Sequence, residues 1–154
     1  MRFGDLLLLR LPLAIWVGAG VLAAVAAPGV FREVPSRDLA GRVFGEILRR
    51  LEGLFHVLSA VLVIGVFTAV GREGRIVGRS AATAGGIFLA VASNVYGSMV
   101  LRPRMAYYRA QAGSFDGLSA DNPWKRKFGA LHRRSTRVLL AGVASAVAAL
   151  LCAP

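Results

Sequence analysis

The stretch of sequence that decides the fold is residues 124–153, which read WKRKFGALHRRSTRVLLAGVASAVAALLCA. Steps of three and four along an α-helix return to the same face, so this stretch predicts one helix with a continuous stripe. The stripe consists of Trp124, Phe128, Leu131, His132, Ser135, Leu139 and Gly142. Lysine and arginine residues surround its first half, and no charged residue follows Arg137. A helix that is basic at one end and apolar all round at the other is typical of a helix that enters a bilayer.

The composition of the whole chain gives the same indication. Of its 154 residues, 56% are hydrophobic, and the formal net charge is +11. A soluble domain of this size seldom combines so much apolar content with so uneven a charge distribution. Because the lysines and arginines lie between apolar runs and not in a separate basic domain, we expect them to meet lipid and not nucleic acid. The single cysteine, Cys152, excludes an internal disulfide.

Four uncharged runs occupy residues 11–31, 53–71, 80–101 and 138–154. Each approaches or exceeds the roughly 17–25 residues that a spanning helix needs. The sequence therefore predicts an all-α fold, a single four-helix transmembrane domain over residues 1–154. The predicted spans are residues 8–31, 51–71, 80–102 and 134–153.

The connections between the spans contain helix signals of their own. Ser36 is a suitable N-cap, and a helix can run unbroken from it to about residue 70. The pair Asn122-Pro123 predicts another helix start, with asparagine as the cap and proline in the first turn. We therefore expect amphipathic helical extensions on the cytoplasmic side before the second and fourth spans. Pro28 and Pro35 are expected to break the chain after the first span, and Pro103 is expected at the start of the third connection, where the third helix leaves its span.

The distribution of lysine and arginine predicts the orientation in the membrane. The first connection carries five of these residues and the third carries nine, against five in the termini and second connection together. Since cytoplasmic connections carry the excess of positive charge, we expect the first and third connections in the cytoplasm and both termini outside. We expect the membrane to be a bacterial inner membrane. The second connection, residues 72–79, predicts a tight turn.

Small residues recur at a spacing of four in the first, third and fourth spans. They are Ala14/Gly18, Gly20/Ala24, Ala82/Gly86/Ala90 and Ala141/Ser145/Ala149. Such stripes allow helix backbones to approach closely within lipid. We therefore expect a compact bundle with few bulky core residues.

Several short motifs follow the order and spacing of a known family. They are Pro28-x-x-Phe31, Ala40-Gly41, Pro103, and Phe128-x-x-Leu131-His132-x-x-Ser135 before the last span. In these motifs the chain resembles the four-helix membrane family of unknown function that includes transmembrane protein 205 (domain of unknown function 4149). The resemblance covers nearly the whole chain. It implies a small integral membrane protein whose biochemical activity is not established.

Two histidines and a serine form the first candidate site. His132 shares its helix face with Phe128 and Ser135, and we expect this face to point into the bundle because the other faces are lined with charge. His56 lies early in the second span, at a predicted depth similar to that of His132. Two imidazoles at one level could ligate haem or a metal ion, or pass a proton. The alternative is a histidine that holds a helix junction through a hydrogen bond to a serine or a backbone carbonyl.

Two further polar residues lie in or beside the spans. Asn94 is close to the middle of the third span, where a buried amide needs a hydrogen-bond partner. We expect either an interhelical hydrogen bond or the lining of a solute path. Glu52 opens the second span and is within reach of Arg49 or His56 along its own helix, as in a surface ion pair.

Aromatic and basic residues around the third connection predict contact with lipid headgroups, because amphipathic rings and cations gather at that depth. They are Tyr107, Tyr108, Trp124, Lys125, Arg126, Lys127, Arg133 and Arg134. We expect anionic lipids to be partners of the protein.

Three functions remain open from the sequence. The leading one is a non-enzymatic protein, with no catalytic residue, that handles a small solute or ion at the cytoplasmic-side cluster of His132, Ser135 and His56. Four short helices rarely enclose a pathway alone, so this function would need a homo-oligomer or a partner. The first alternative is an accessory or structural subunit of a larger membrane complex. The second is a haem- or quinone-binding redox protein with the two histidines as ligands; otherwise we expect no cofactor and no metal, since no Cys or carboxylate has matching spacing.

Overall fold

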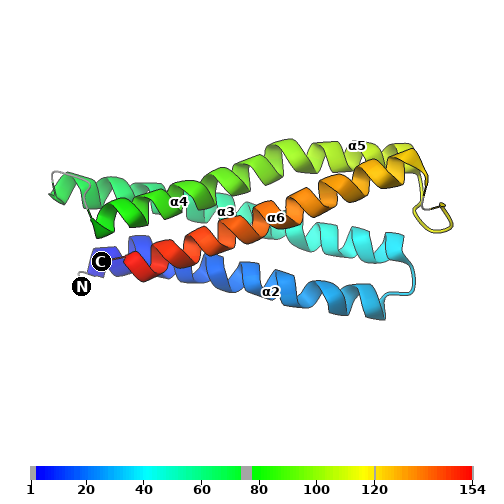
Figure 1. Ribbon diagram of the computed structural model, residues 1–154. Helices are drawn as coiled ribbons and strands as arrows, with labels where there is room; N and C mark the ends of the chain where they lie inside the picture. The colour runs from blue at the N-terminus through cyan, green and yellow to red at the C-terminus, as the bar shows by residue number, and fades with distance from the viewer. Residues whose placement is uncertain (1–2, 74–77, 120, 154) are drawn as a thin grey trace.

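The computed structural model describes residues 3–73, 78–119 and 121–153, which form four long helical rods lying side by side (Figure 1). The first rod consists of α1 (Phe3–Asp5), the π-helix η1 (Leu6–Arg10) and α2 (Leu11–Glu33), and the second is α3 (Arg37–Glu73). The third consists of α4 (Arg79–Tyr96), the π-helix η2 (Gly97–Leu101) and α5 (Arg102–Ala112), and the fourth is α6 (Pro123–Cys152). No strand occurs in these residues, and the predicted all-α four-helix fold is confirmed.

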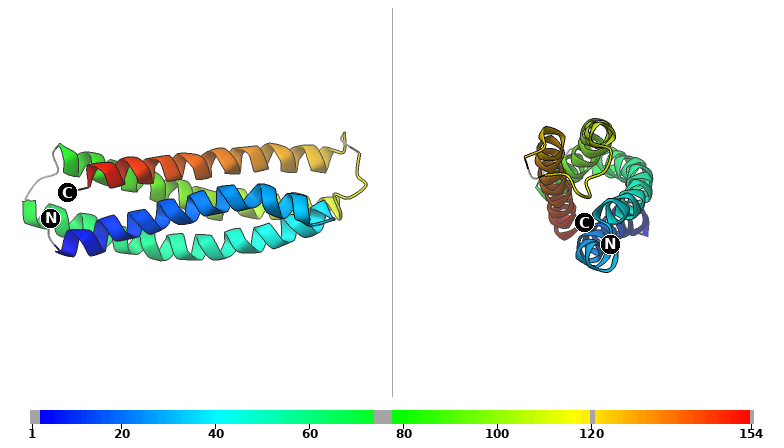
Figure 2. Two further views of the ribbon diagram at one scale, coloured as in Figure 1. Left: turned by 90° about the horizontal axis from the view of Figure 1, so that it is seen from below. Right: turned by 90° about the vertical axis from the view of Figure 1, so that its right-hand side faces the viewer.

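The rods form an up-and-down bundle. α2 packs against α3 and α6, and α4 packs against the same two helices, with the most extensive contact between α4 and α6. Both chain termini lie at one end of the bundle, which we call the terminal end (Figures 1 and 2). The junctions of α2 with α3 and of α5 with α6 lie at the opposite end, the loop end. The tight turn predicted at 72–79 includes residues 74–77, which lie outside the described residues.

The outer surface of the bundle is that of a membrane protein. Each of the four rods is long and apolar enough to cross a membrane, and each predicted span lies within one rod, apart from residue 153, which directly follows α6. Large apolar side chains point outward, among them Leu22 at 68% exposure, Phe67 at 73% and Phe88 at 70%. A soluble protein rarely exposes apolar surface on this scale, whereas the core of a bilayer surrounds it with hydrocarbon. The chain is an integral membrane protein.

The bulkiest core contact joins the first two rods. The rings of Trp16 on α2 and Phe55 on α3 stack with centroids 4.6 Å apart and planes 16° from parallel. Both side chains are buried, together with Leu13 and Leu62 beside them. Such stacked aromatic pairs add attraction to the burial of their area. The pair fixes the position of α3 beside α2 in the middle of the bundle.

The predicted close approach of backbones is found between α4 and α6. A Cβ atom on Gly86 would lie 2.8 Å from the carbonyl oxygen of Ser145 and 2.9 Å from the Cβ of Ala149. A Cβ on Gly142 would lie 3.1 Å from the Cβ of Ser93. Cβ atoms do not make contacts as short as those at Gly86, and the contact at Gly142 would require Ser93 to shift. The small-residue stripes therefore bring these two helices together, as expected of helix packing in lipid.

Both predicted helix starts are confirmed. The Ser36 hydroxyl accepts a hydrogen bond from the amide of Leu39 at 3.1 Å, and α3 begins at the next residue. The Asn122 side-chain oxygen accepts hydrogen bonds from the amides of Trp124 at 3.0 Å and Lys125 at 3.2 Å. These bonds satisfy amide groups that the first turn of a helix leaves free. Because the helices begin at these caps, α3 and α6 include the predicted amphipathic extensions ahead of the second and fourth spans.

The predictions that Pro28 breaks the chain and that the third helix ends at Pro103 are wrong. α2 continues past Pro28 to Glu33, and the third rod continues past Pro103 to Ala112. A proline ring clashes with the carbonyl four residues earlier in a regular helix. The clash is relieved at Pro103 because η2 directly precedes α5 and its wider turn moves that carbonyl away. The π-helix η1 likewise comes just before Pro12, and its wider turn relieves the corresponding clash there.

Candidate functional site

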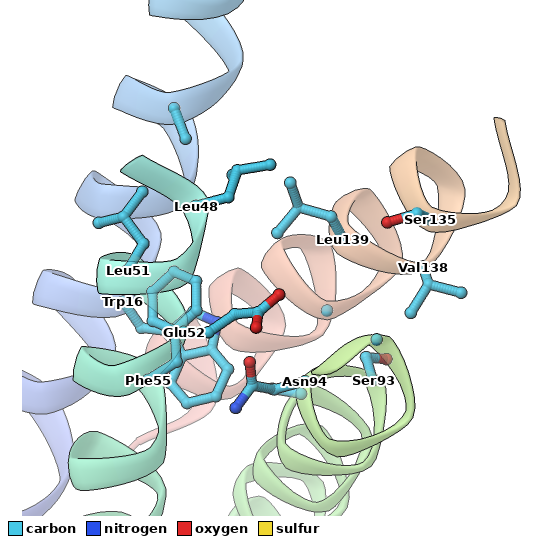
Figure 3. A pocket seen from close by; sticks show the side chains of 14 residues that line it. Trp16, Leu48, Leu51, Glu52, Phe55, Ser93, Asn94, Ser135, Val138 and Leu139 are labelled. Carbon is cyan, nitrogen blue, oxygen red and sulfur yellow. The ribbon is translucent and has the colours of Figure 1, made fainter. Parts of the chain in front are cut away.

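A small cavity lies inside the bundle between α2, α3, α6 and the α4–η2 rod (Figure 3). Its volume is about 60 Å³. A single water molecule needs on the order of 10–15 Å³ measured in this way, so the cavity has room for a few small molecules of that size. Its polar lining residues are Glu52, Ser93, Asn94 and Ser135, and its apolar lining includes Trp16, Phe55 and Leu139. We call this the central cavity.

Asn94 supplies the polar group of the central cavity that has no protein partner. Its side-chain nitrogen, Nδ2, is buried and makes no hydrogen bond with any described residue. A buried amide left in this state destabilises a fold by about 1–3 kcal/mol. Figure 3 shows the Asn94 side chain extending from α4 toward Phe55, with its amide oxygen on the side of Glu52 and its nitrogen turned the other way. Asn94 therefore holds an unsatisfied hydrogen-bond donor in the wall of the cavity.

Glu52 faces the cavity from α3 and is paired with a cation of another rod. Its Oε1 lies 2.6 Å from Nη2 of Arg102, and the two side chains are 25% and 29% exposed. The prediction that Glu52 reaches Arg49 or His56 along its own helix is wrong. Arg49 binds Glu46 instead, with Nη2 2.7 Å from Oε1. Glu52 pairs with Arg102 because the third rod passes beside it as a helix, where the sequence predicted the end of that rod.

His132 lies outside the cavity, and the prediction that it points into the bundle is wrong. Its side chain is exposed, and its ring stacks on that of Phe128, one turn earlier on the same helix, with centroids 6.2 Å apart. The inward face of α6 follows alternating steps of three and four residues from Phe128 through Ser135 to Gly142. Near the loop end, α6 packs against its neighbours through this narrow face alone. His132 lies beside the face and not on it, so its side chain stays exposed.

His56 is also exposed, and both of its ring nitrogens have partners. Nδ1 lies 2.7 Å from the carbonyl oxygen of Glu52, and Nε2 lies 3.4 Å from the hydroxyl of Ser98. This is the helix-junction arrangement that the sequence left open. Among the described residues, no hydrogen bond or ring contact joins His56 to His132, and no group of three metal-ligating side chains is found. The haem hypothesis stays a prediction, which an absorption spectrum of the purified protein tests through the Soret band.

The structure thus brings together part of the predicted site and adds to it. Asn94 and Ser135 line the central cavity, whereas the two histidines do not. Glu52 also lines the cavity, where the sequence predicted only a surface ion pair. The available signal was its position one turn before Phe55, which places the two side chains on the same face of α3.

The motif residues of the first two helices are packed at the loop end. Ala40 is fully buried, and a Cβ on Gly41 would lie 3.1 Å from Nη2 of Arg109. The residue at position 41 is small because the Arg109 side chain crosses α3 at this point. Phe31 packs edge-on against Phe44 with centroids 6.2 Å apart and joins the last turn of α2 to α3.

Asp38 ties the α5–α6 junction to the first turn of α3. Its carboxylate accepts hydrogen bonds from the Ser114 hydroxyl and, at 2.8 Å, from the Phe115 amide. The Arg109 guanidinium donates to its backbone carbonyl at 2.8 Å. The hydrogen bond from Ser114, followed by that from Phe115 and the charge of Arg109, lowers the pKa of Asp38 below its usual value, against the opposing effect of burial. Asp38 lies ahead of the predicted span 51–71, on the aqueous side.

The predicted headgroup residues lie at the loop end of α6. The rings of Tyr108 and Trp124 stack with centroids 6.0 Å apart, and the Lys127 ammonium lies 4.9 Å from the centroid of the Trp124 ring. Lys125 is half-buried and donates to the carbonyl of Leu118 at 2.7 Å, which ties it to the protein. The other predicted cations have exposed side chains; they are Arg126, Lys127, Arg133 and Arg134.

The fold and the central cavity define the class of protein, a four-helix integral membrane protein with a small cavity inside the bundle, mainly apolar and with four polar lining residues. The sequence model of one family, Domain of unknown function (DUF4149), matches residues 11–114, and the chain belongs to this family. The match includes Pro28, Phe31, Ala40, Gly41 and Pro103, whereas the Phe128 to Ser135 motif lies outside it. Comparisons with curated proteins and with solved structures found no match.

Proposed function

We propose that this protein is a non-enzymatic membrane protein that binds a small, uncharged, hydrogen-bonding solute in the central cavity. The observation that carries the proposal is the unpartnered Nδ2 of Asn94, buried beside a cavity of about 60 Å³. A bound acceptor oxygen would satisfy this donor and remove the penalty of its burial.

The charges around the cavity favour a neutral occupant. Glu52 is the carboxylate of the lining, and Arg102 balances its charge at 2.6 Å. An incoming ion would have to compete with this pair in a region of low dielectric constant. A neutral molecule of a few atoms, with one acceptor for Asn94 and one donor for a glutamate or serine oxygen, avoids that competition. Small amides and alcohols have this chemistry.

Tryptophan fluorescence provides a direct binding test, because Trp16 lines the cavity and the chain has two tryptophans. In a Trp124→Phe variant, Trp16 is the sole reporter. We expect its emission to change saturably with one of urea, acetamide or methanol. Asn94→Leu should weaken that binding about three- to tenfold, the effect of one hydrogen bond. Ser98→Ala, whose hydroxyl lies outside the cavity, should leave it unchanged. Equal affinities of Asn94→Leu and its parent, or no saturable change with any of the three, would contradict the proposal.

The orientation is part of the same proposal. With both termini outside, the loop end faces the cytoplasm, and the cavity lies at the cytoplasmic boundary of predicted spans 51–71 and 134–153. The support is the excess of lysine and arginine in the two connections at the loop end. Cys152, near the terminal end, is the single cysteine, so its labelling reports on which side of the membrane that end lies. A membrane-impermeant maleimide should label it in intact cells; labelling only after permeabilisation would reverse the orientation.

An accessory subunit of a membrane complex is the second candidate, and one observation favours it. Ala14 and Gly18 lie on the outward face of α2, and no heavy atom lies within 4 Å of a Cβ placed on Gly18. A face of small residues suits close packing against a helix of another subunit. The mass of the protein extracted with its native lipids separates the two candidates. A solute-binding protein is expected to contain copies of this chain alone, and an accessory subunit to carry a different chain in fixed ratio.

A further inference from the structure

A second hollow lies on the outside of the protein, between α5 and the first turns of α6. It has a volume of about 510 Å³ and is lined by Pro103, Arg104, Tyr107, Tyr108, Lys127 and residues 130–131 of α6. We call it the α5–α6 groove. The third rod continues past Pro103 as α5, and α6 lies beside it. The groove is the space between these two helices. No part of the central cavity belongs to it.

The groove contains two cations that form no salt bridge among the described residues, and aromatic rings orient one of them. The Lys127 ammonium lies 4.9 Å from the centroid of the Trp124 ring and 5.8 Å from that of the Tyr108 ring. Arg104 and Lys127 have exposed side chains, and among the described residues neither forms a salt bridge. The cation–π contacts orient Lys127 but leave its charge uncompensated. The groove therefore attracts an anion.

The position of the groove fits the depth of lipid phosphates. Arg104 and Tyr107 follow the predicted span 80–102 by two and five residues, and Lys127 precedes the span 134–153 by seven. At about 1.5 Å per residue these side chains begin roughly 3–11 Å outside the hydrocarbon, which is the headgroup region. Met99, four residues before Pro103 of the lining and on the membrane side of it, is 67% exposed and offers an apolar surface for an acyl chain.

We infer that the α5–α6 groove binds the phosphate of an anionic phospholipid between Arg104 and Lys127, with the tyrosine hydroxyls of Tyr107 and Tyr108 as further donors. A zwitterionic lipid is disfavoured because its ammonium group would approach the remaining cations of α6. A phosphate carried by an anionic lipid has no such group. Its acyl chains lie along the apolar flank, so the same molecule satisfies both parts of the groove.

Quenching by brominated lipids tests this inference on the intact chain. Trp124 lies beside the groove, whereas Trp16 is 2% exposed and contributes a constant background. In vesicles of phosphatidylcholine, brominated phosphatidylglycerol should quench the emission more strongly than the same fraction of brominated phosphatidylcholine. Lys127→Gln and Arg104→Gln should each reduce this preference about fivefold, the effect of one cation near a lipid surface. Arg42→Gln, which removes an exposed charge of α3 at the same end, is the matched control and should retain it.

Three results would overturn the inference, and the first two come from the quenching comparison. One is equal quenching by the two lipids. The other is a loss of preference with Arg42→Gln as large as with Lys127→Gln, which would show attraction by net charge alone. Inorganic phosphate at millimolar concentration should leave the lipid preference unchanged; displacement of the lipid by it would show a general anion site instead. None of these readouts depends on Asn94, so the solute proposal and the lipid inference stand or fail separately.

Discussion

Oε1 of Glu52 and Nη2 of Arg102 lie 2.6 Å apart, and this ion pair links α3 to the start of α5. Glu52 also lines the central cavity, so the pair holds one cavity wall against the third rod. The link exists because η2 carries the third rod onward as a helix. A local irregularity of the backbone therefore determines which cation balances the carboxylate of the site.

The first prediction concerns this pair. Glu52→Gln leaves the largely buried Arg102 without its counter-charge and should lower the stability by about 1–3 kcal/mol. Glu33→Gln is the control, because Glu33 and its partner Arg32 have side chains 71% and 80% exposed, and such pairs contribute about 0–1 kcal/mol. Thermal unfolding of both variants in one detergent measures the difference. A loss for Glu33→Gln equal to that for Glu52→Gln would refute the role of the pair.

A matched pair of glycines tests the contact of α4 with α6. Gly86→Ala places a Cβ 2.8 Å from the Ser145 carbonyl oxygen and should destabilise the bundle by about 1–3 kcal/mol. Gly85→Ala meets no heavy atom within 4 Å and should be neutral, or stabilise by up to about 1 kcal/mol through helix propensity. The same unfolding assay compares them. If the two substitutions have equal effects, the close approach of the two backbones is not a source of stability.

The exposed position of His132 predicts that its removal has little effect. His132→Ala should change the free energy of unfolding by less than about 0.5 kcal/mol, as is usual for surface positions. Phe128→Ala should cause a larger loss, because the Phe128 ring also packs against that of Phe115, with centroids 4.8 Å apart. Solute binding by the His132→Ala variant should equal that of the parent. A marked loss of binding would contradict this prediction and show that His132 contributes to the site.

Asp38 predicts a pH dependence at the loop end. Its pKa is lowered in the folded protein, so its contribution to stability is complete above the usual value of 3.8 and is lost as the pH falls further toward the folded-state value. Hydrogen exchange of the Phe115 amide, which donates to Asp38, should therefore lose protection as the pH falls below about 3.8. Asp38→Asn should lack this step, and Asp121→Asn, exposed at the α5–α6 junction, should keep it. Protection that persists through this range in the parent would contradict the assignment.

Much of the fold could be predicted because its determinants are local. The length of each apolar run requires a spanning helix, and the caps at Ser36 and Asn122 depend on the next three residues. The small-residue stripes of α4 and α6 predict close packing for the same reason. Pro103 was misleading because the rule that proline ends a helix assumes a regular turn before it, and η2 is not regular.

The site was predicted less well because it depends on contacts between rods. On a helix, His132 and Ser135 are 60° apart, and the sequence pattern alone does not decide which of them meets a neighbour. The packing partners of α6 decide it in favour of Ser135. The pairing of Glu52 with Arg102 joins residues fifty positions apart in the sequence, so no local pattern indicates it. Asn94 could be singled out because a lone amide within an apolar run is a local signal.

The most direct test of the solute proposal is a high-resolution structure of the protein in lipid, solved with and without the solute that the Trp16 assay selects. With the solute, we expect density in the central cavity with an acceptor atom about 2.7–3.2 Å from Nδ2 of Asn94. A dry cavity in both structures, with Nδ2 bonded to a carbonyl of the protein itself, would contradict it.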